Sequence, residues 1–236
     1  MADFWLRIFL VRHGHVSYFD KEDQPVNPKY AQLSHEGIEQ IRLLAENLKH
    51  LPFESVYSST MPRSIQTAEF LTQHQNSKDI LAVDAIREIK AGRLRDLLID
   101  KAEQELKNAY LFQTNNLESF LQGESWEGFS NRVITWFEQI ILSKSKSQNI
   151  LISSHDAVNR IIIGWMYGNN LADIYTQEQD YGCLNILDIQ IKSNSIFRKR
   201  IKLQNFTIYN PLKNQLFNSA MDEVYKVYIK NNGFKE

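Results

Sequence analysis

Cysteine is almost absent from this sequence, since Cys183 is the only one among 236 residues. An intrachain disulfide and a Cys-x-x-Cys metal site are therefore both excluded. This low cysteine content fits a reducing compartment, and we expect a cytoplasmic protein.

Long apolar runs and an excess of charge of either sign are also absent. No run approaches the roughly 18 consecutive apolar residues of a transmembrane helix. The apolar N-terminus is interrupted by Arg7 and has no small-residue cleavage site after it, which argues against a signal peptide. The formal net charge is −1, so nothing global favours nucleic acid or an anionic membrane surface as a partner. An anionic substrate would need a local cluster of basic side chains.

What the sequence does contain is an alternation of short apolar segments with amphipathic ones. Segments typical of strands lie at 6–11, 53–57, 80–83, 149–152, 184–191 and 196–203. Helices are predicted to begin at Ser34, Pro62, Trp126 and Asp156. Strands that alternate with helices predict an α/β fold with a mostly parallel sheet and helices on both faces.

Two segments do not fit this alternation. Residues 96–122 have an irregular helical pattern with few strong apolar positions, and we interpret about 96–125 as a candidate lid insertion. A C-terminal extension begins at about 204 and contains a marginal helical pattern at 217–230. We predict a single domain over 1–236, in which either segment could form a lid or the face of a homodimer.

Residues with chemical potential follow four of the predicted strands. Arg12 and His13 come after the first, Arg63 after the second, Glu88 after the third and His155 after the fourth. Ligands of such sheets bind beyond the carboxyl ends of the strands. We therefore expect these five side chains to lie together at one edge of the sheet.

These residue types suit phosphoryl transfer. A neutral histidine with one ring nitrogen held and the other free can attack phosphorus, and His13 on a tight turn fits this role. The planar guanidinium groups of Arg12 and Arg63 can neutralise the phosphoryl oxygens, and His155, expected to be protonated, adds positive charge. Glu88 is a candidate general acid. Taken singly, each has an ordinary alternative as a packed, capping or solvated residue.

The order of the motifs is more specific than any one of them. Arg-His-Gly at 12–14, Leu-Ser-x-x-Gly-x-x-Gln at 33–40, Ser-Ser-x-x-x-Arg-Ser-x-Gln-Thr-Ala at 58–68 and Ser-His before a helix resemble the histidine phosphatase superfamily. The resemblance runs from about residue 6 to 190. It implies a phosphoglycerate-mutase-like fold, a three-layer α/β/α sandwich. It also implies a phosphohistidine at His13, phosphate binding by Arg12, Arg63 and His155, Glu88 as proton donor, and neither metal nor cofactor.

Several positions depart from the family pattern. Val16 and Phe19 stand where the family often has threonine and asparagine, and Asp156 stands where glycine is common. Residues 93–96 replace an aromatic-acidic-Gly ending. These changes disfavour a mutase, because a mutase needs a tailored pocket in which its substrate reorients, whereas hydrolysis needs only water.

Three hypotheses follow for the function. The leading one is a phosphatase that hydrolyses a phosphomonoester, either a small phosphorylated metabolite or a phosphoprotein. The alternatives are a phosphoglycerate mutase-type phosphotransferase and a binding or regulatory module that keeps the fold without turnover. Specificity is expected to reside in residues 14–32 and 96–125.

Overall fold

The computed structural model describes most of the chain. The described residues are 3–18, 26–75, 79–92, 106, 110, 118–169, 171, 174–214, 218, 221, 222 and 226. The candidate lid at 96–125 and the helical pattern at 217–230 lie mostly outside them, so these two predictions stay untested.

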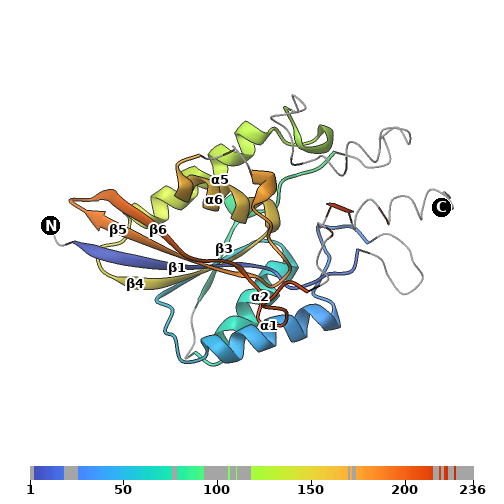
Figure 1. Cartoon of the computed structure of the whole chain (residues 1–236), viewed down its shortest axis with the longest axis horizontal. Coiled ribbons are helices and arrows are strands. Elements are labelled where there is room, and N and C mark those ends of the chain that lie inside the picture. The colour runs from blue at the N-terminus through green and yellow to red at the C-terminus, as the bar shows by residue number, and fades with distance from the viewer. Residues whose placement is uncertain are drawn as a thin grey trace.

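A six-stranded sheet forms the centre of the molecule, in the order β3-β2-β4-β1-β5-β6 (Figure 1). Its strands are β1 (Phe4–Arg12), β2 (Ser55–Ser59), β3 (Ile80–Val83), β4 (Gln148–Ser154), β5 (Leu184–Lys192) and β6 (Ser195–Phe206). The first four pair in parallel, whereas β5 is antiparallel to both β1 and β6. The predicted mostly parallel sheet is confirmed.

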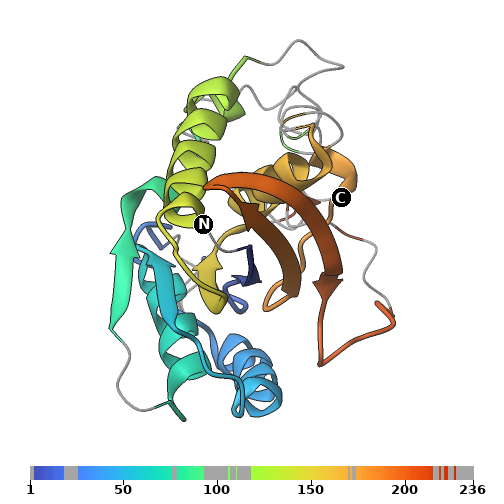
Figure 2. The same cartoon turned by 90° about the vertical axis from the view of Figure 1, so that its left-hand side faces the viewer.

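Helices cover both faces of this sheet. The helices α1 (His35–Leu48) and α2 (Pro62–Thr72) lie on one face, and α5 (Trp126–Leu142) and α6 (Asp156–Tyr167) lie on the other (Figures 1 and 2). Short 3₁₀ turns form η1 (Asp84–Ile86), η3 (Phe120–Gln122) and η4 (Ile174–Thr176). The three-layer α/β/α sandwich is confirmed.

None of the helices within the described part of the chain combines the length and apolar character that crossing a bilayer requires.

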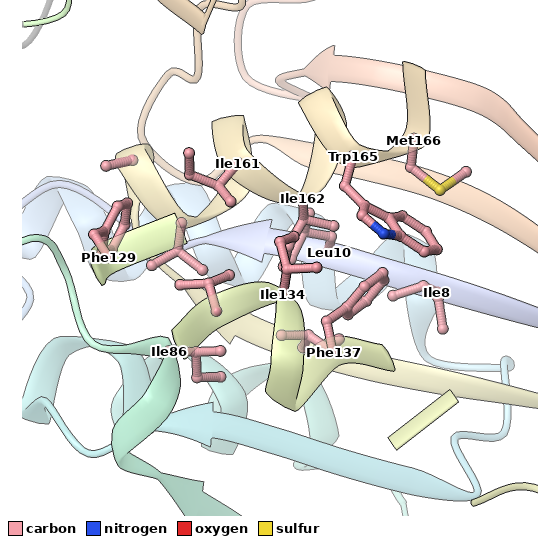
Figure 3. Close-up of a cluster of buried hydrophobic side chains, with 14 of the residues drawn as sticks. Ile8, Leu10, Ile86, Phe129, Ile134, Phe137, Ile161, Ile162, Trp165 and Met166 are labelled. Atoms are coloured by element: carbon pink, nitrogen blue, oxygen red, sulfur yellow. The ribbon is translucent and has the colours of Figure 1, made fainter. Parts of the chain in front are cut away.

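Strand β1 is buried on both faces, which is why it reads as an almost continuous apolar run. Ile8 and Leu10 face α5 and α6, where they meet Phe137 and Ile162 (Figure 3). Val11 faces α1 and α2. The strand is thereby held in the middle of the molecule, and its carboxyl end fixes the position of Arg12.

The ends of the helices follow from local chemistry. The Ser34 side chain accepts a hydrogen bond from the Gly37 amide, Pro62 occupies the first turn of α2, and Gly168 ends α6 in the left-handed region at φ 84°. The helix starts at Ser34 and Pro62 were predicted from the sequence. Two helix starts matter for the site, because Arg63 lies in the first turn of α2 and His155 is the N-cap of α6.

The predicted boundaries of β2 were wrong by two residues. The strand was expected at 53–57, but it spans Ser55–Ser59, and its last two serines pair with β3. Burial of serine is tolerated there because Ser58 Oγ is 3.1 Å from Ser64 Oγ and Ser59 Oγ is 2.8 Å from His155 Nε2. The apolar pattern ends at Tyr57, but the strand continues through Ser58 and Ser59, whose buried hydroxyl groups have hydrogen-bond partners.

The loop after β1 packs directly on the start of α1. A Cβ atom at Gly14 would lie 2.5 Å from the Gly37 carbonyl oxygen, and one at Gly37 would lie 2.1 Å from the His15 carbonyl oxygen. The His15 amide also donates to Gln40 Oε1 at 2.9 Å. Two glycines therefore permit a backbone contact that fixes the loop carrying His13.

We expect Gly37→Ala to lower the free energy of unfolding by about 1–3 kcal/mol, because the added methyl group must push the loop off the helix. Urea denaturation followed by circular dichroism measures this loss. The matched control is Leu43→Ala in the same helix, where the side chain is 49% exposed, and its expected change is within about 0.5 kcal/mol. Similar small losses for both variants would contradict the proposed packing role.

Candidate active site

Four of the five predicted site residues meet in one buried cluster at the carboxyl edge of the sheet. Arg12 ends β1 and His13 follows it, Arg63 lies in the first turn of α2, and His155 is the N-cap of α6. All four side chains are buried. Burying a polar or charged side chain costs free energy unless the side chain is hydrogen-bonded or ion-paired. The contacts of each residue therefore show how its burial is compensated.

The His13 ring is held in one tautomer. Its Nδ1 is 2.8 Å from the Gly14 carbonyl oxygen, which can only accept, so Nδ1 carries the proton. Its Nε2 accepts a hydrogen bond from Arg63 Nε at 3.0 Å. Burial, followed by the charges of Arg63 and Arg12, lowers the pKa of His13 well below its ordinary value. The ring is thus neutral, with an Nε2 lone pair directed into the cluster, as a histidine nucleophile requires.

Arg12 is held by groups from the segment before β5 and from the first turn of α6. Its Nη1 donates to the Gln179 carbonyl, and its guanidinium carbon lies 3.9 Å from the centre of the Tyr181 ring. Asp156 Oδ2 lies 3.9 Å from Nη1. Among the described residues, the buried Nε of Arg12 has no acceptor. A donor held in place without an acceptor is what an anionic ligand would use.

Arg63 connects α2 to the nucleophile and to the loop before α1. Besides its bond to His13, it donates from Nη1 to the Pro28 carbonyl at 2.7 Å, and its Nη2 is 3.3 Å from Met61 Sδ. Thr67 Oγ1 accepts from the Gly14 amide at 3.4 Å and donates to the Arg63 carbonyl at 2.8 Å. Helix α2 therefore sets both Arg63 and the loop of His13.

His155 stands opposite His13, with 5.1 Å between the ring centres. Its Nε2 is 2.8 Å from Ser59 Oγ, and its buried Nδ1 has no partner among the described residues. Burial, then the charges of Arg63 and of His13, lowers the pKa of His155 well below its ordinary value, which disfavours the protonated ring that the sequence predicts beside a phosphate. A phosphate dianion between the rings would favour protonation again.

Glu88 lies on the segment after η1 and reaches the start of α6. Its Oε1 accepts from the Ile89 amide at 3.0 Å and its Oε2 from the Ala157 amide at 3.4 Å. Burial first, and the nearby Asp156 carboxylate second, raise the pKa of Glu88 to about 6. A carboxyl group with this pKa still carries its proton in weakly acidic solution, which suits a general acid.

Sequence reasoning missed two supports of this cluster. One is Asp156, whose buried carboxylate accepts from Arg160 Nε at 2.6 Å. The i, i+4 spacing of these two residues on a predicted helix was a usable signal. The other is the turn that contains Gln179 and Tyr181, which gave no signal because it holds Arg12 through a backbone carbonyl and a ring face.

The departures from the family pattern have different structural outcomes. Val16 is buried in the core beneath α1 and α2 and bridges to Leu33, so it contributes packing. Phe19 and residues 93–96 lie outside the described residues. Within the part of the chain that the structure describes, no three His, Cys, Asp or Glu side chains gather in a way that could hold a metal ion.

Comparison with known proteins identifies the family. The model of the histidine phosphatase superfamily (branch 1) matches residues 8–201. Phosphoserine phosphatase 1 of Hydrogenobacter thermophilus is 23% identical over 203 residues, covering 83% of this chain and 92% of its own length. The adenosylcobalamin/alpha-ribazole phosphatase of Escherichia coli is 27% identical over 203 residues, covering 79% and 92%.

A solved structure gives the same result for the fold. The alpha-ribazole phosphatase of Shigella flexneri matches with a TM-score of 0.66 at 23% identity, and the match covers 84% of this chain and 96% of that one. The prediction of a histidine phosphatase is confirmed by the family match. With the family model spanning most of the sequence and the sandwich fold in place, this chain belongs to the histidine phosphatase superfamily.

Proposed function

We propose that the protein hydrolyses a phosphomonoester through a phosphohistidine intermediate at His13. The observation that carries the proposal is the state of that ring. Nδ1 is fixed by the Gly14 carbonyl, Nε2 is unprotonated and accepts a hydrogen bond from Arg63 Nε, and the His155 ring lies 5.1 Å from the His13 ring. This is the arrangement of an activated nucleophile beside a site for an anion.

In the first step His13 Nε2 attacks phosphorus and the bond from phosphorus to the ester oxygen breaks. Arg12 and Arg63 neutralise the charge on the equatorial oxygens, with Arg63 Nε turning from His13 to a phosphoryl oxygen. Glu88 transfers its proton to the leaving alcohol, so that the alcohol departs neutral.

In the second step water hydrolyses the phosphohistidine. The Glu88 carboxylate takes a proton from the water as its oxygen bonds to phosphorus and the N–P bond breaks. Inorganic phosphate leaves, and both His13 and Glu88 return to their starting states. His13, Glu88 and one water molecule account for every bond and proton that changes in the two steps.

The substrate is proposed to be a small phosphorylated metabolite or a phosphoprotein, handled in the cytoplasm. The names of the curated relatives support hydrolysis, since phosphoserine phosphatase and ribazole phosphatase are both phosphatases. The buried Cys183 fits a reducing compartment. A mutase would instead move phosphate between hydroxyl groups, so an assay of phosphoglycerates that shows only phosphate release argues against it.

Replacing His13 with Ala is expected to lower kcat for an aryl phosphate by at least roughly 10³-fold, because the nucleophile is removed. Rapid quench with ³²P-labelled substrate should trap an acid-labile adduct on the wild type and none on this variant. His50→Ala, in which an exposed histidine is removed, serves as the control and should retain full activity. Equal rates for wild type and His13→Ala would exclude the mechanism.

Glu88→Gln is expected to slow hydrolysis of an alkyl phosphate far more than that of an aryl phosphate. Only the poor alkyl leaving group needs the proton, so the losses should be roughly 10²–10⁴-fold and under tenfold, respectively. Steady-state kinetics with the two substrates measures both. Equal losses would remove Glu88 from the acid role.

Activity on an alkyl phosphate is expected to fall as the pH rises above about 6. The raised pKa of Glu88 keeps the acid protonated below about 6, and above it the protonated fraction falls about tenfold per pH unit. A profile of kcat/KM against pH measures this. Phosphate esters also titrate in this range, so the comparison is with Glu88→Gln, which should lack the decline that belongs to Glu88. Superimposable profiles would contradict the assignment.

A further inference from the structure

Residues 205–214, which we call the C-terminal strap, lie against the turn formed by residues 179–183. The strap begins at the end of β6 and lies beyond the residues that match the family. The turn leads from η4 into β5. Because this turn holds Arg12, the strap is connected to the proposed phosphate site through one intermediate layer of residues.

The turn contacts both the backbone and the side chain of Arg12, and so sets the position of this residue. Gln179 accepts from Arg12 Nη1, and the Tyr181 ring lies 3.9 Å from the guanidinium carbon. The Arg12 amide donates to the Cys183 carbonyl at 3.1 Å, and the Gly182 amide donates to the His13 carbonyl at 3.0 Å. A displacement of the turn would therefore move the guanidinium group away from its present orientation.

Asp180 is the main attachment of the strap to this turn. Its Oδ2 accepts from Lys213 Nζ at 2.6 Å and from Asn205 Nδ2 at 2.9 Å. Its backbone amide donates to Asn205 Oδ1 at 2.8 Å. The charged pair is partly buried, with Lys213 31% and Asp180 17% exposed, so it is less screened than a surface pair.

Tyr209 supplies a second attachment, because its hydroxyl donates to the Tyr181 carbonyl at 2.9 Å. The strap is also braced internally. Lys213 Nζ donates to Thr207 Oγ1 at 3.1 Å, and Thr207 Oγ1 donates to the Asn210 carbonyl at 2.7 Å. Lys213 has φ of 56°, a left-handed conformation that is uncommon for lysine and is retained here by its surroundings.

We propose that Lys213 and Tyr209 are positioning residues for phosphate binding, acting on Arg12 through Asp180 and Tyr181. Neither residue is placed in contact with substrate. The proposal rests on the proposed function, since it gives Arg12 the role of a phosphate ligand. It differs from a general stabilising role for the strap in one respect: the effect of the strap on phosphate affinity must disappear when Arg12 is altered.

The first experiment compares Lys213→Met with the wild type. We expect the KM for an aryl phosphate and the dissociation constant of inorganic phosphate, measured by titration calorimetry, to rise roughly tenfold, with kcat changed much less. Lys202→Met, at an exposed lysine on β6, is the matched control and should leave both constants unchanged. Tyr209→Phe should shift them in the same direction by a smaller factor. Unchanged constants in Lys213→Met would overturn the proposal.

The second experiment is a double-mutant cycle between Lys213 and Arg12. In an Arg12→Lys background, Lys213→Met should produce little further loss of phosphate affinity, because the group that it positions is gone. A full additional loss would show that the strap acts independently of Arg12 and would overturn the proposal. If circular dichroism shows Lys213→Met to be unfolded, Tyr209→Phe replaces it in the same cycle.

Failure of the proposed function is separable from failure of this inference. A wild type that binds inorganic phosphate without turning over any phosphomonoester would remove the hydrolytic mechanism. The phosphate titrations would still decide whether Lys213 and Arg12 are coupled.

Discussion

The structure depends on burying two guanidinium groups beside a neutral histidine. Among the described residues, the carboxylate paired with them is that of Asp156, which lies 3.9 Å from Arg12 Nη1, too far for a hydrogen bond. Arg12 and Arg63 are instead held by the carbonyl oxygens of Gln179 and Pro28. Carbonyls accept hydrogen bonds without cancelling charge, so the cluster remains strongly positive in a poorly hydrated place. Burial first, and that field second, lower the pKa of His13 and keep its Nε2 unprotonated. The same field makes a phosphate dianion the natural ligand.

The acidic groups are arranged around this centre rather than within it. The Asp156 carboxylate is occupied by Arg160, which also donates to the carbonyls of Ile174 and Tyr175. Its charge still acts on Glu88, where it adds to burial in raising the pKa. The residue that departs from the common family glycine thus has an electrostatic effect on the candidate acid, separate from any contact with substrate.

Much of the fold and the meeting of the site residues could be predicted from the sequence, because both depend on strong local patterns. β1 and β4 are buried on both faces and read as apolar runs, and Ser34 and Pro62 mark helix starts. The prediction was less successful where tertiary contacts replace local ones. Ser58 and Ser59 extend β2 through side-chain bonds, and the charge state of His155 depends on fields from separate elements. No sequence pattern marks the turn at 179–183 as the support of Arg12, since the backbone carbonyl that holds Arg12 is present in every residue.

The strand order of the sheet also bears on how the chain reaches this structure during synthesis. β1 leaves the ribosome before the other described strands, yet its two neighbours, β4 and β5, begin at Gln148 and Leu184. A continuous apolar strand therefore has no partner in the sheet until synthesis has passed Gln148. Such long-range pairing slows folding and exposes the nascent segment to aggregation. Protection of this central strand while the chain is incomplete is the kind of task that chaperones perform.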